Sequence, residues 1–112
     1  MKPRGRPKKI KIVSEDPKIS QFSPRGKPGR PDEVDLSLEE FEALRLADFD
    51  QKDQKQAGKS MAISQQTFSR ILKKARKKLA EGLVFGKMIR IQGGSYKLAP
   101  KAHPSQNKGQ SI

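Results

Sequence analysis

Residues 54–71, QKQAGKSMAISQQTFSRI, predict two short helices joined by a tight turn. Asp53 stands where the first helix needs an N-cap, because its carboxylate can accept a hydrogen bond from a backbone N–H of the first turn. Gly58 is small, as a position must be where the second helix crosses closely over the first. Residues 61–63 supply the turn, and Ser64 supplies the N-cap of the second helix. The pattern predicts a helix-turn-helix.

The second of these helices has one apolar and one polar face. Phe68, Ile71 and Leu72 recur at helical spacing and are expected to point into a core. The other face carries amides, hydroxyls and a guanidinium, which can read base edges in the major groove of DNA. The candidate base-reading residues are Ser64, Gln65, Gln66, Ser69 and Arg70, and Thr67 is a candidate phosphate contact. Crossed pairs of short helices also occur in domains that bind no nucleic acid, so this segment alone leaves that alternative open.

The charge of the chain is large, positive and unevenly distributed. The net charge is +13. Residues 1–31 hold ten Lys or Arg against two acids, residues 32–53 hold two against nine, and residues 54–112 hold thirteen against one. Two basic blocks on either side of an acidic one favour binding to a polyanion, and nucleic acid is the commonest polyanion in a cell.

Composition limits the remaining possibilities. The 112 residues, 32% of them hydrophobic, are expected to form one domain with a small core. No apolar run is long enough for a membrane span or a signal peptide. The chain has no cysteine and its single histidine is His103, so we expect no disulfide, metal or cofactor. With no catalytic constellation in view, we expect a cytoplasmic, nucleoid-associated protein that is not an enzyme.

The first nine residues, MKPRGRPKK, are too charged and too rich in proline to fold alone. Within them the run RGRP resembles the core of an AT-hook, which lays two arginines along a narrow A·T minor groove. The alternative is a disordered basic arm that touches phosphates without preference. In both cases the expected contacts to the DNA backbone or minor groove are Arg4, Arg6, Lys8 and Lys9.

A longer helix is predicted from Ser37, where Glu40 can complete a capping box. Its apolar residues are expected to lie largely on one side, and they are Leu38, Phe41, Leu44 and Phe49. The three carboxylates of its first turns have no partner base or metal ligand nearby in the sequence. We expect Glu39, Glu40 and Glu42 to form a solvated surface rather than a catalytic site.

The second helix of the predicted helix-turn-helix extends to Gly86, which is a typical stop signal. Its apolar stripe is expected to continue through Ala75, Leu79 and Leu83. The other face carries a dense row of cations, including Arg76 and Lys78. Contact with DNA phosphates is expected above all from Lys73, Lys74 and Lys77.

Strands are predicted at both ends of the helical region. The alternation in residues 10–13 indicates one short strand, and residues 88–98 predict a β-hairpin with a Gly93-Gly94 turn that pairs Ile91 with Tyr96. The expected organisation is a basic arm with one strand over residues 1–31, a helix-turn-helix domain with the hairpin over residues 32–98, and a disordered tail over residues 99–112.

Four runs of residues resemble a known protein family. They are FSPRGKP at 22–28, EALRLAD at 42–48, SQQTFSRIL at 64–72 and IQGGSY at 91–96. Together they resemble an uncharacterised family of small bacterial and archaeal proteins that are predicted to bind DNA. The resemblance covers about residues 3–98. It implies a mainly α fold whose three-helix helix-turn-helix is similar to the promoter-binding C-terminal domain of sigma factors.

Three positions depart from the family pattern. Lys52 stands where the family usually has an apolar residue, Ala62 where a turn glycine is common, and Gln65 where arginine is frequent. The last departure leaves the sequence preference open. Some family members carry N-terminal cysteines that suggest a metal, and this cysteine-free chain does not match them.

The leading hypothesis is a transcriptional regulator that binds double-stranded DNA, with a homodimer as a candidate assembly. One alternative is a sigma-like module that contacts RNA polymerase through the acidic first helix. Another is a nucleoid- or RNA-associated basic protein without sequence preference.

Overall fold

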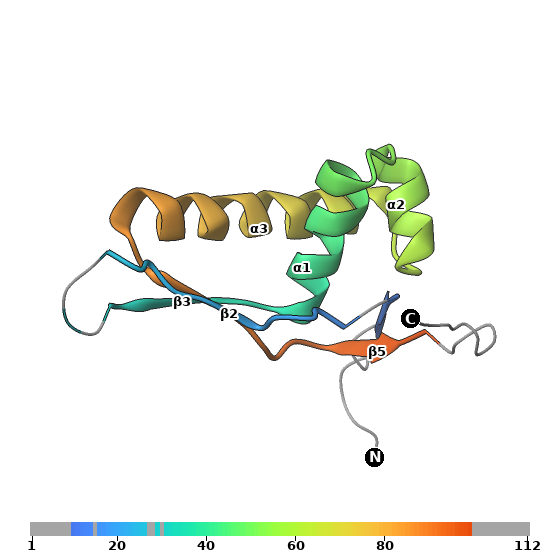
Figure 1. The fold of residues 1–112 in the computed structure, drawn as a ribbon. Helices are drawn as coiled ribbons and strands as arrows, with labels where there is room; N and C mark the ends of the chain where they lie inside the picture. Colours follow the sequence, from blue (N-terminus) through green and yellow to red (C-terminus); the bar gives the residue numbers. More distant parts are fainter. Residues whose placement is uncertain (1–9, 15, 27–28, 30, 100–112) are drawn as a thin grey trace, which may run out of the picture.

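A computed structural model describes residues 10–14, 16–26, 29 and 31–99 of the chain (Figure 1). Helices form one layer and short strands form the other, so the expected mainly α fold is confirmed at that level. The predicted arm residues Arg4, Arg6, Lys8 and Lys9 lie outside the described residues. The elements, in chain order, are β1 (Lys11–Val13), β2 (Gln21–Phe22), β3 (Glu33–Leu36), α1 (Leu38–Leu44), the π-helical turn η1 (Arg45–Phe49), α2 (Gln54–Ser60), α3 (Gln65–Phe85), β4 (Met88–Ile91) and β5 (Tyr96–Leu98).

The predicted helix ends are confirmed. Ser37 and Glu40 form a complete capping box at the start of α1, with 3.1 Å from the Glu40 amide nitrogen to Ser37 Oγ and 2.9 Å from the Ser37 amide nitrogen to Glu40 Oε1. Asp53 caps α2 and Ser64 caps α3. Gly86 ends α3 with a φ of 67°, a left-handed conformation that glycine adopts without strain.

The predicted hairpin is wrong. Strand β4 pairs in parallel with β3 on one side and antiparallel with β2 on the other, while β5 pairs in parallel with β1. Both edges of β4 are therefore occupied, and Ile91 and Tyr96 belong to different sheets. Gly93 and Gly94 carry the chain away from β4 with positive φ angles, and the Gly93 carbonyl accepts a hydrogen bond from the Leu38 amide at 3.0 Å. The two glycines thus lead into β5 beside the start of α1 instead of closing a hairpin.

The π-helical turn η1 changes which side chains of the first helix are buried. In this turn the Asp50 amide donates to the Arg45 carbonyl at 2.8 Å, a bond that spans five residues instead of four. The extra residue shifts the phase of the helix, so Leu46 is buried and Phe49 is 80% exposed. Phe49 therefore stays outside the core, although it belongs to the apolar side that the sequence predicted for this helix.

Two apolar clusters fix the orientation of α3. One lies between α3 and the strands and includes Ala75 with Val34 and Ile89. The other lies among the helices and includes Phe68 and Leu72 together with residues of α1, η1 and α2. The expected inward stripe is confirmed for Phe68, Leu72 and Ala75. It does not extend to Leu83, which is 73% exposed because the helix passes beyond the end of α1 there.

No helix within the described part of the chain is both long enough and apolar enough to cross a membrane.

Candidate nucleic-acid interface

The turn between α2 and α3 is closed by backbone hydrogen bonds. The Ile63 amide donates to the Gly58 carbonyl at 2.9 Å, and Met61 and Ile63 point into the helical cluster. A Cβ atom on Gly58 would lie 3.1 Å from the Ile63 carbonyl oxygen and 3.3 Å from that of Ser64. The small residue expected at this crossing is thus required by the turn backbone itself. Ala62, at the tip, has a φ of 60°.

The first turns of α3 present a polar outer surface. Gln65, Gln66, Ser69 and Arg70 are exposed and together line a shallow depression of about 470 Å³. Four of the five candidate base-reading residues are therefore brought together. The Ser69 hydroxyl donates to Gln54 Oε1 at 2.6 Å, which ties this surface to α2.

The fifth base-reading candidate, Ser64, forms hydrogen bonds with the phosphate-contact candidate, Thr67. Ser64 Oγ accepts a hydrogen bond from the Thr67 amide and donates to the Thr67 hydroxyl, both at close to 3 Å. Ser64 is exposed and Thr67 is half-buried. Their side chains therefore cap the N-terminus of α3.

The cations of α3 divide into two groups. Arg76 forms two hydrogen bonds with the Asp48 carboxylate, at 2.7 and 3.1 Å, and Lys78 lies 2.8 Å from Glu40. The hydrogen bond from Arg76 lowers the pKa of Asp48 below its ordinary value, and the same bond raises the pKa of Arg76. The exposed group, by contrast, forms no salt bridge with any described residue, and it consists of Arg70, Lys73, Lys74 and Lys77.

The acidic residues of α1 do not form the solvated surface that we expected. Glu40 and Glu42 are buried, and Glu42 is 0% exposed. Glu42 accepts hydrogen bonds from the Ser14 amide at 3.1 Å and from Arg45 at 2.9 and 3.0 Å. These carboxylates are satisfied inside the protein, because α1 packs against both α3 and β1. The negative block of the sequence thus pairs with Arg45, Arg76 and Lys78, and it leaves the other cations of the outer face of α3 without a salt bridge to a described carboxylate.

Strand β1 brings the N-terminal region to the same part of the molecule. The Ile12 amide donates to the Met61 carbonyl at 3.0 Å, which attaches β1 to the turn between α2 and α3. Ile10, the first described residue, is exposed. Strand β1 therefore lies beside this turn, and the predicted arm residues precede it in the sequence.

Comparison with known proteins places the chain in a family. Residues 1–99 match the family described as "Protein of unknown function DUF134". The chain belongs to this family. A UPF0251 protein of Methanococcus maripaludis strain C5 is 47% identical over 96 residues, which cover 85% of this chain and 74% of the relative. A UPF0251 protein of Halothermothrix orenii is 44% identical over 108 residues, covering 93% of this chain and 80% of the relative.

The family extends across prokaryotes. A UPF0251 protein of Thermoanaerobacter pseudethanolicus is 43% identical over 94 residues, which cover 83% of this chain and 80% of the relative. The resemblance found in the sequence motifs is confirmed as family membership. No solved structure matches the chain at a significant level.

Proposed function

We propose that this protein binds double-stranded DNA, with α2, the turn and α3 acting as a helix-turn-helix and the N-terminal end of α3 lying in the major groove. One observation carries the proposal. The outer face of α3 collects exposed amides, a guanidinium and lysines that form no salt bridge with a described residue, while Glu40 and Glu42 of α1 are buried and bonded to Lys78 and Arg45. A helix with such a face fits the width of the major groove and meets phosphates on either side.

The roles of the outer residues follow from their positions along α3. Gln66 and Arg70 lie one turn apart in the first turns, where base edges are in reach of a docked helix. Glutamine can pair bidentately with adenine, and arginine with guanine. Lys73 and Lys77 continue the same face toward the C-terminus, where we assign them to phosphates.

A second contact is supported by the attachment of β1. Because Ile12 is bonded to Met61, a basic arm that begins before Ile10 starts next to the turn of the proposed helix-turn-helix. From that point Arg4 and Arg6 can reach the backbone or the adjacent minor groove, as an AT-hook-like segment would. We infer a transcriptional regulator of sigma-factor-like architecture, without catalytic activity.

The burial of Glu40 and Glu42 weighs against the polymerase alternative. That alternative required an exposed acidic first helix, and these carboxylates are instead bonded to Lys78 and Arg45. We therefore propose sequence-specific DNA binding. A selection experiment can distinguish it from binding without sequence preference.

Selection from a random-site library tests which residues read bases. We expect Gln66→Ala and Arg70→Ala each to relax the preference at one or two base positions, with a loss of roughly 1–3 kcal/mol of discrimination at each. Lys77→Ala should weaken all sites about equally, because a phosphate contact carries no sequence information. Gln66, Arg70 and Lys77 are all exposed, so the fold should survive each change.

The wild-type protein and Lys77→Ala are the matched controls in this selection. An enriched motif that is unchanged by both Gln66→Ala and Arg70→Ala would show that this helix is not the reader. Absence of any enriched motif with the wild-type protein would favour the nucleoid- or RNA-associated alternative.

A further inference from the structure

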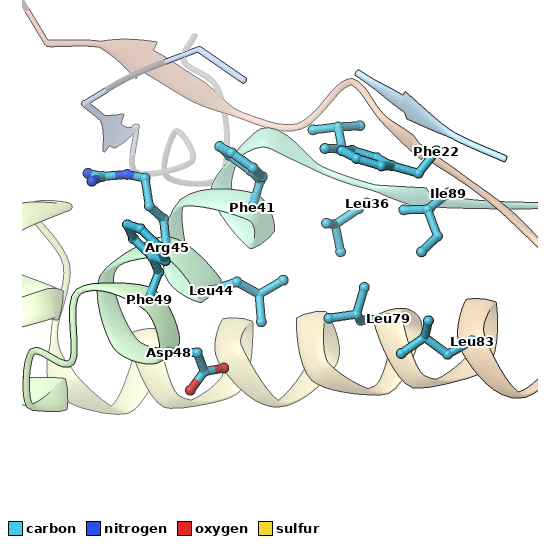
Figure 2. Close-up of a pocket in the computed structure, with 11 residues that line it drawn as sticks. Phe22, Leu36, Phe41, Leu44, Arg45, Asp48, Phe49, Leu79, Leu83 and Ile89 are labelled. Carbon is cyan, nitrogen blue, oxygen red and sulfur yellow. The ribbon is translucent and has the colours of Figure 1, made fainter. Parts of the chain in front are cut away.

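An open apolar groove lies on the side of α3 that faces α1, away from Gln66 and Arg70. It has a volume of about 710 Å³ and runs between the α1–η1 segment, the C-terminal half of α3 and the strands (Figure 2). Buried and partly buried residues from each of these three segments form the floor of the groove, such as Leu44 of α1, Leu79 of α3 and Ile89 of β4.

Large apolar side chains project around this groove. Phe49 comes from the η1 wall, Phe22 from the strand wall and Leu83 from α3, and each is more than half exposed. Together they offer roughly 400 Å² of apolar surface, before the groove interior is counted. An interface of standard size buries about 800 Å² on each partner, a little over half of it apolar, so this face is large enough for one.

We propose that a second copy of this chain docks on this groove and forms a two-fold symmetric dimer. In a two-fold interface the same surface serves both partners, so it must present a projection and a matching recess together. Here Phe49 projects directly beside the recess that Leu44 and Leu79 line. The π-helical turn is what directs Phe49 outward.

The charges around the groove also favour a second copy. Two chains of net charge +13 repel each other unless they approach through a neutral surface. The two charged residues that line the groove are both neutralised, Arg45 by Glu42 and Asp50, and Asp48 by Arg76. The groove is thus a surface without net charge on a strongly basic protein.

The position of the groove suits the proposed function, on which this step rests. Leu83 follows Arg70 by 13 residues, which is about 20 Å of helix. Two copies that meet near Leu83 with their α3 helices directed apart can hold their recognition ends up to about 40 Å from each other. That span includes the 34–36 Å between successive major grooves on one side of DNA.

Sedimentation velocity on the full chain tests the dimer. We expect the wild-type protein to sediment as a dimer in the micromolar range, and Leu83→Glu and Phe49→Glu to sediment as monomers. Both side chains are exposed, so circular dichroism and the unfolding midpoint should change little. Val84→Glu is the matched control, because Val84 is as exposed as Leu83 but does not line the groove, and it should remain a dimer.

DNA binding by the same variants separates this inference from the proposed function. On a site with two half-sites, Leu83→Glu should lose roughly 100-fold in affinity while keeping the preference for a single half-site. A wild-type monomer that still selects a motif would overturn the dimer alone. A dimer that depends on Leu83 but selects no DNA would overturn the proposed function alone. A monomeric wild type whose groove instead takes up an apolar helix of another protein would also overturn the inference.

Discussion

Ala62 occupies a backbone conformation that side chains other than glycine rarely adopt. Its φ of 60° lies in the left-handed region at the tip of the turn between α2 and α3. A residue with a Cβ atom in this conformation lowers the stability of the folded state by about 1–2 kcal/mol. A glycine avoids this strain, but it lowers stability by about 0.4–1 kcal/mol because it raises the entropy of the unfolded chain. We therefore expect Ala62→Gly to raise the free energy of unfolding by about 0.5–1 kcal/mol, measured by urea denaturation.

Ala80→Gly is the control for that change. Ala80 is also exposed but lies within α3, where glycine lowers stability by about 1 kcal/mol. The two substitutions should thus move the free energy of unfolding in opposite directions. Equal destabilisation by both would mean that Ala62 is not strained in solution.

Single residues were predicted well where the cause is local. The caps at Ser37, Asp53 and Ser64 depend on hydrogen bonds within one helical turn, so the sequence contains all the information. The burial of Glu42 depends on Ser14, which is 28 residues away. The spacing of Glu42 and Arg45 by three residues was the one signal that this carboxylate has a partner, and it does not distinguish a surface pair from a buried one.

The crossing of α2 and α3 leaves no room for a side chain at Gly58. A leucine there would press against the carbonyl groups of Ile63 and Ser64, which belong to the turn and cannot move without opening it. We expect Gly58→Leu to lower the free energy of unfolding by about 1–3 kcal/mol or to prevent folding, as read from thermal denaturation. The same change should abolish DNA binding.

Gly26→Leu provides the comparison for a glycine in open space. No atom lies within 4 Å of a Cβ placed on Gly26, and it has no left-handed φ. Its unfolding midpoint should stay close to that of the wild type. If Gly58→Leu were equally harmless, the close crossing described above would not exist in solution.

The strand pairings that escaped sequence-based prediction join residues that lie far apart in the chain. Strand β3 is four residues long in an acidic segment, and its parallel pairing with β4 joins Glu33 to Met88. A tight Gly-Gly turn favoured a local hairpin, but β4 finds two other strands instead. The π-helical turn could not be predicted from the sequence either. One inserted residue changes the phase of a helix, and nothing in the apolar pattern marks it.

Salt dependence is the property in which all the basic groups act together. If the arm and α3 neutralise five to eight phosphates, the logarithm of affinity should fall against the logarithm of salt concentration with a slope of roughly −5 to −7. Deleting residues 2–9 should flatten that slope by roughly 2 to 4 and weaken binding to every sequence. Fluorescence anisotropy over a salt series measures both effects.

Truncation of residues 100–112 is the control, and it should leave the slope nearly unchanged. A slope near −1 for the full chain would show that the basic blocks do not lie on DNA. The AT-hook interpretation predicts a larger loss on A·T-rich than on G·C-rich flanks after deletion of residues 2–9. Equal losses of affinity on the two kinds of flank would instead support a basic arm that contacts phosphates without sequence preference.

The parallel pairing of β1 with β5 has a consequence for how the chain is made. Residues 11–13 leave the ribosome well before their partners at residues 96–98, because all the helices lie between them in the chain. Until those partners emerge, Val13, which is fully buried in the finished protein, has no neighbouring strand. Pairing over such a separation is slow, so the nascent chain can assemble its helices early and must wait to close the strand. Strand β1 therefore completes its pairing only after α1, α2 and α3 have been synthesised.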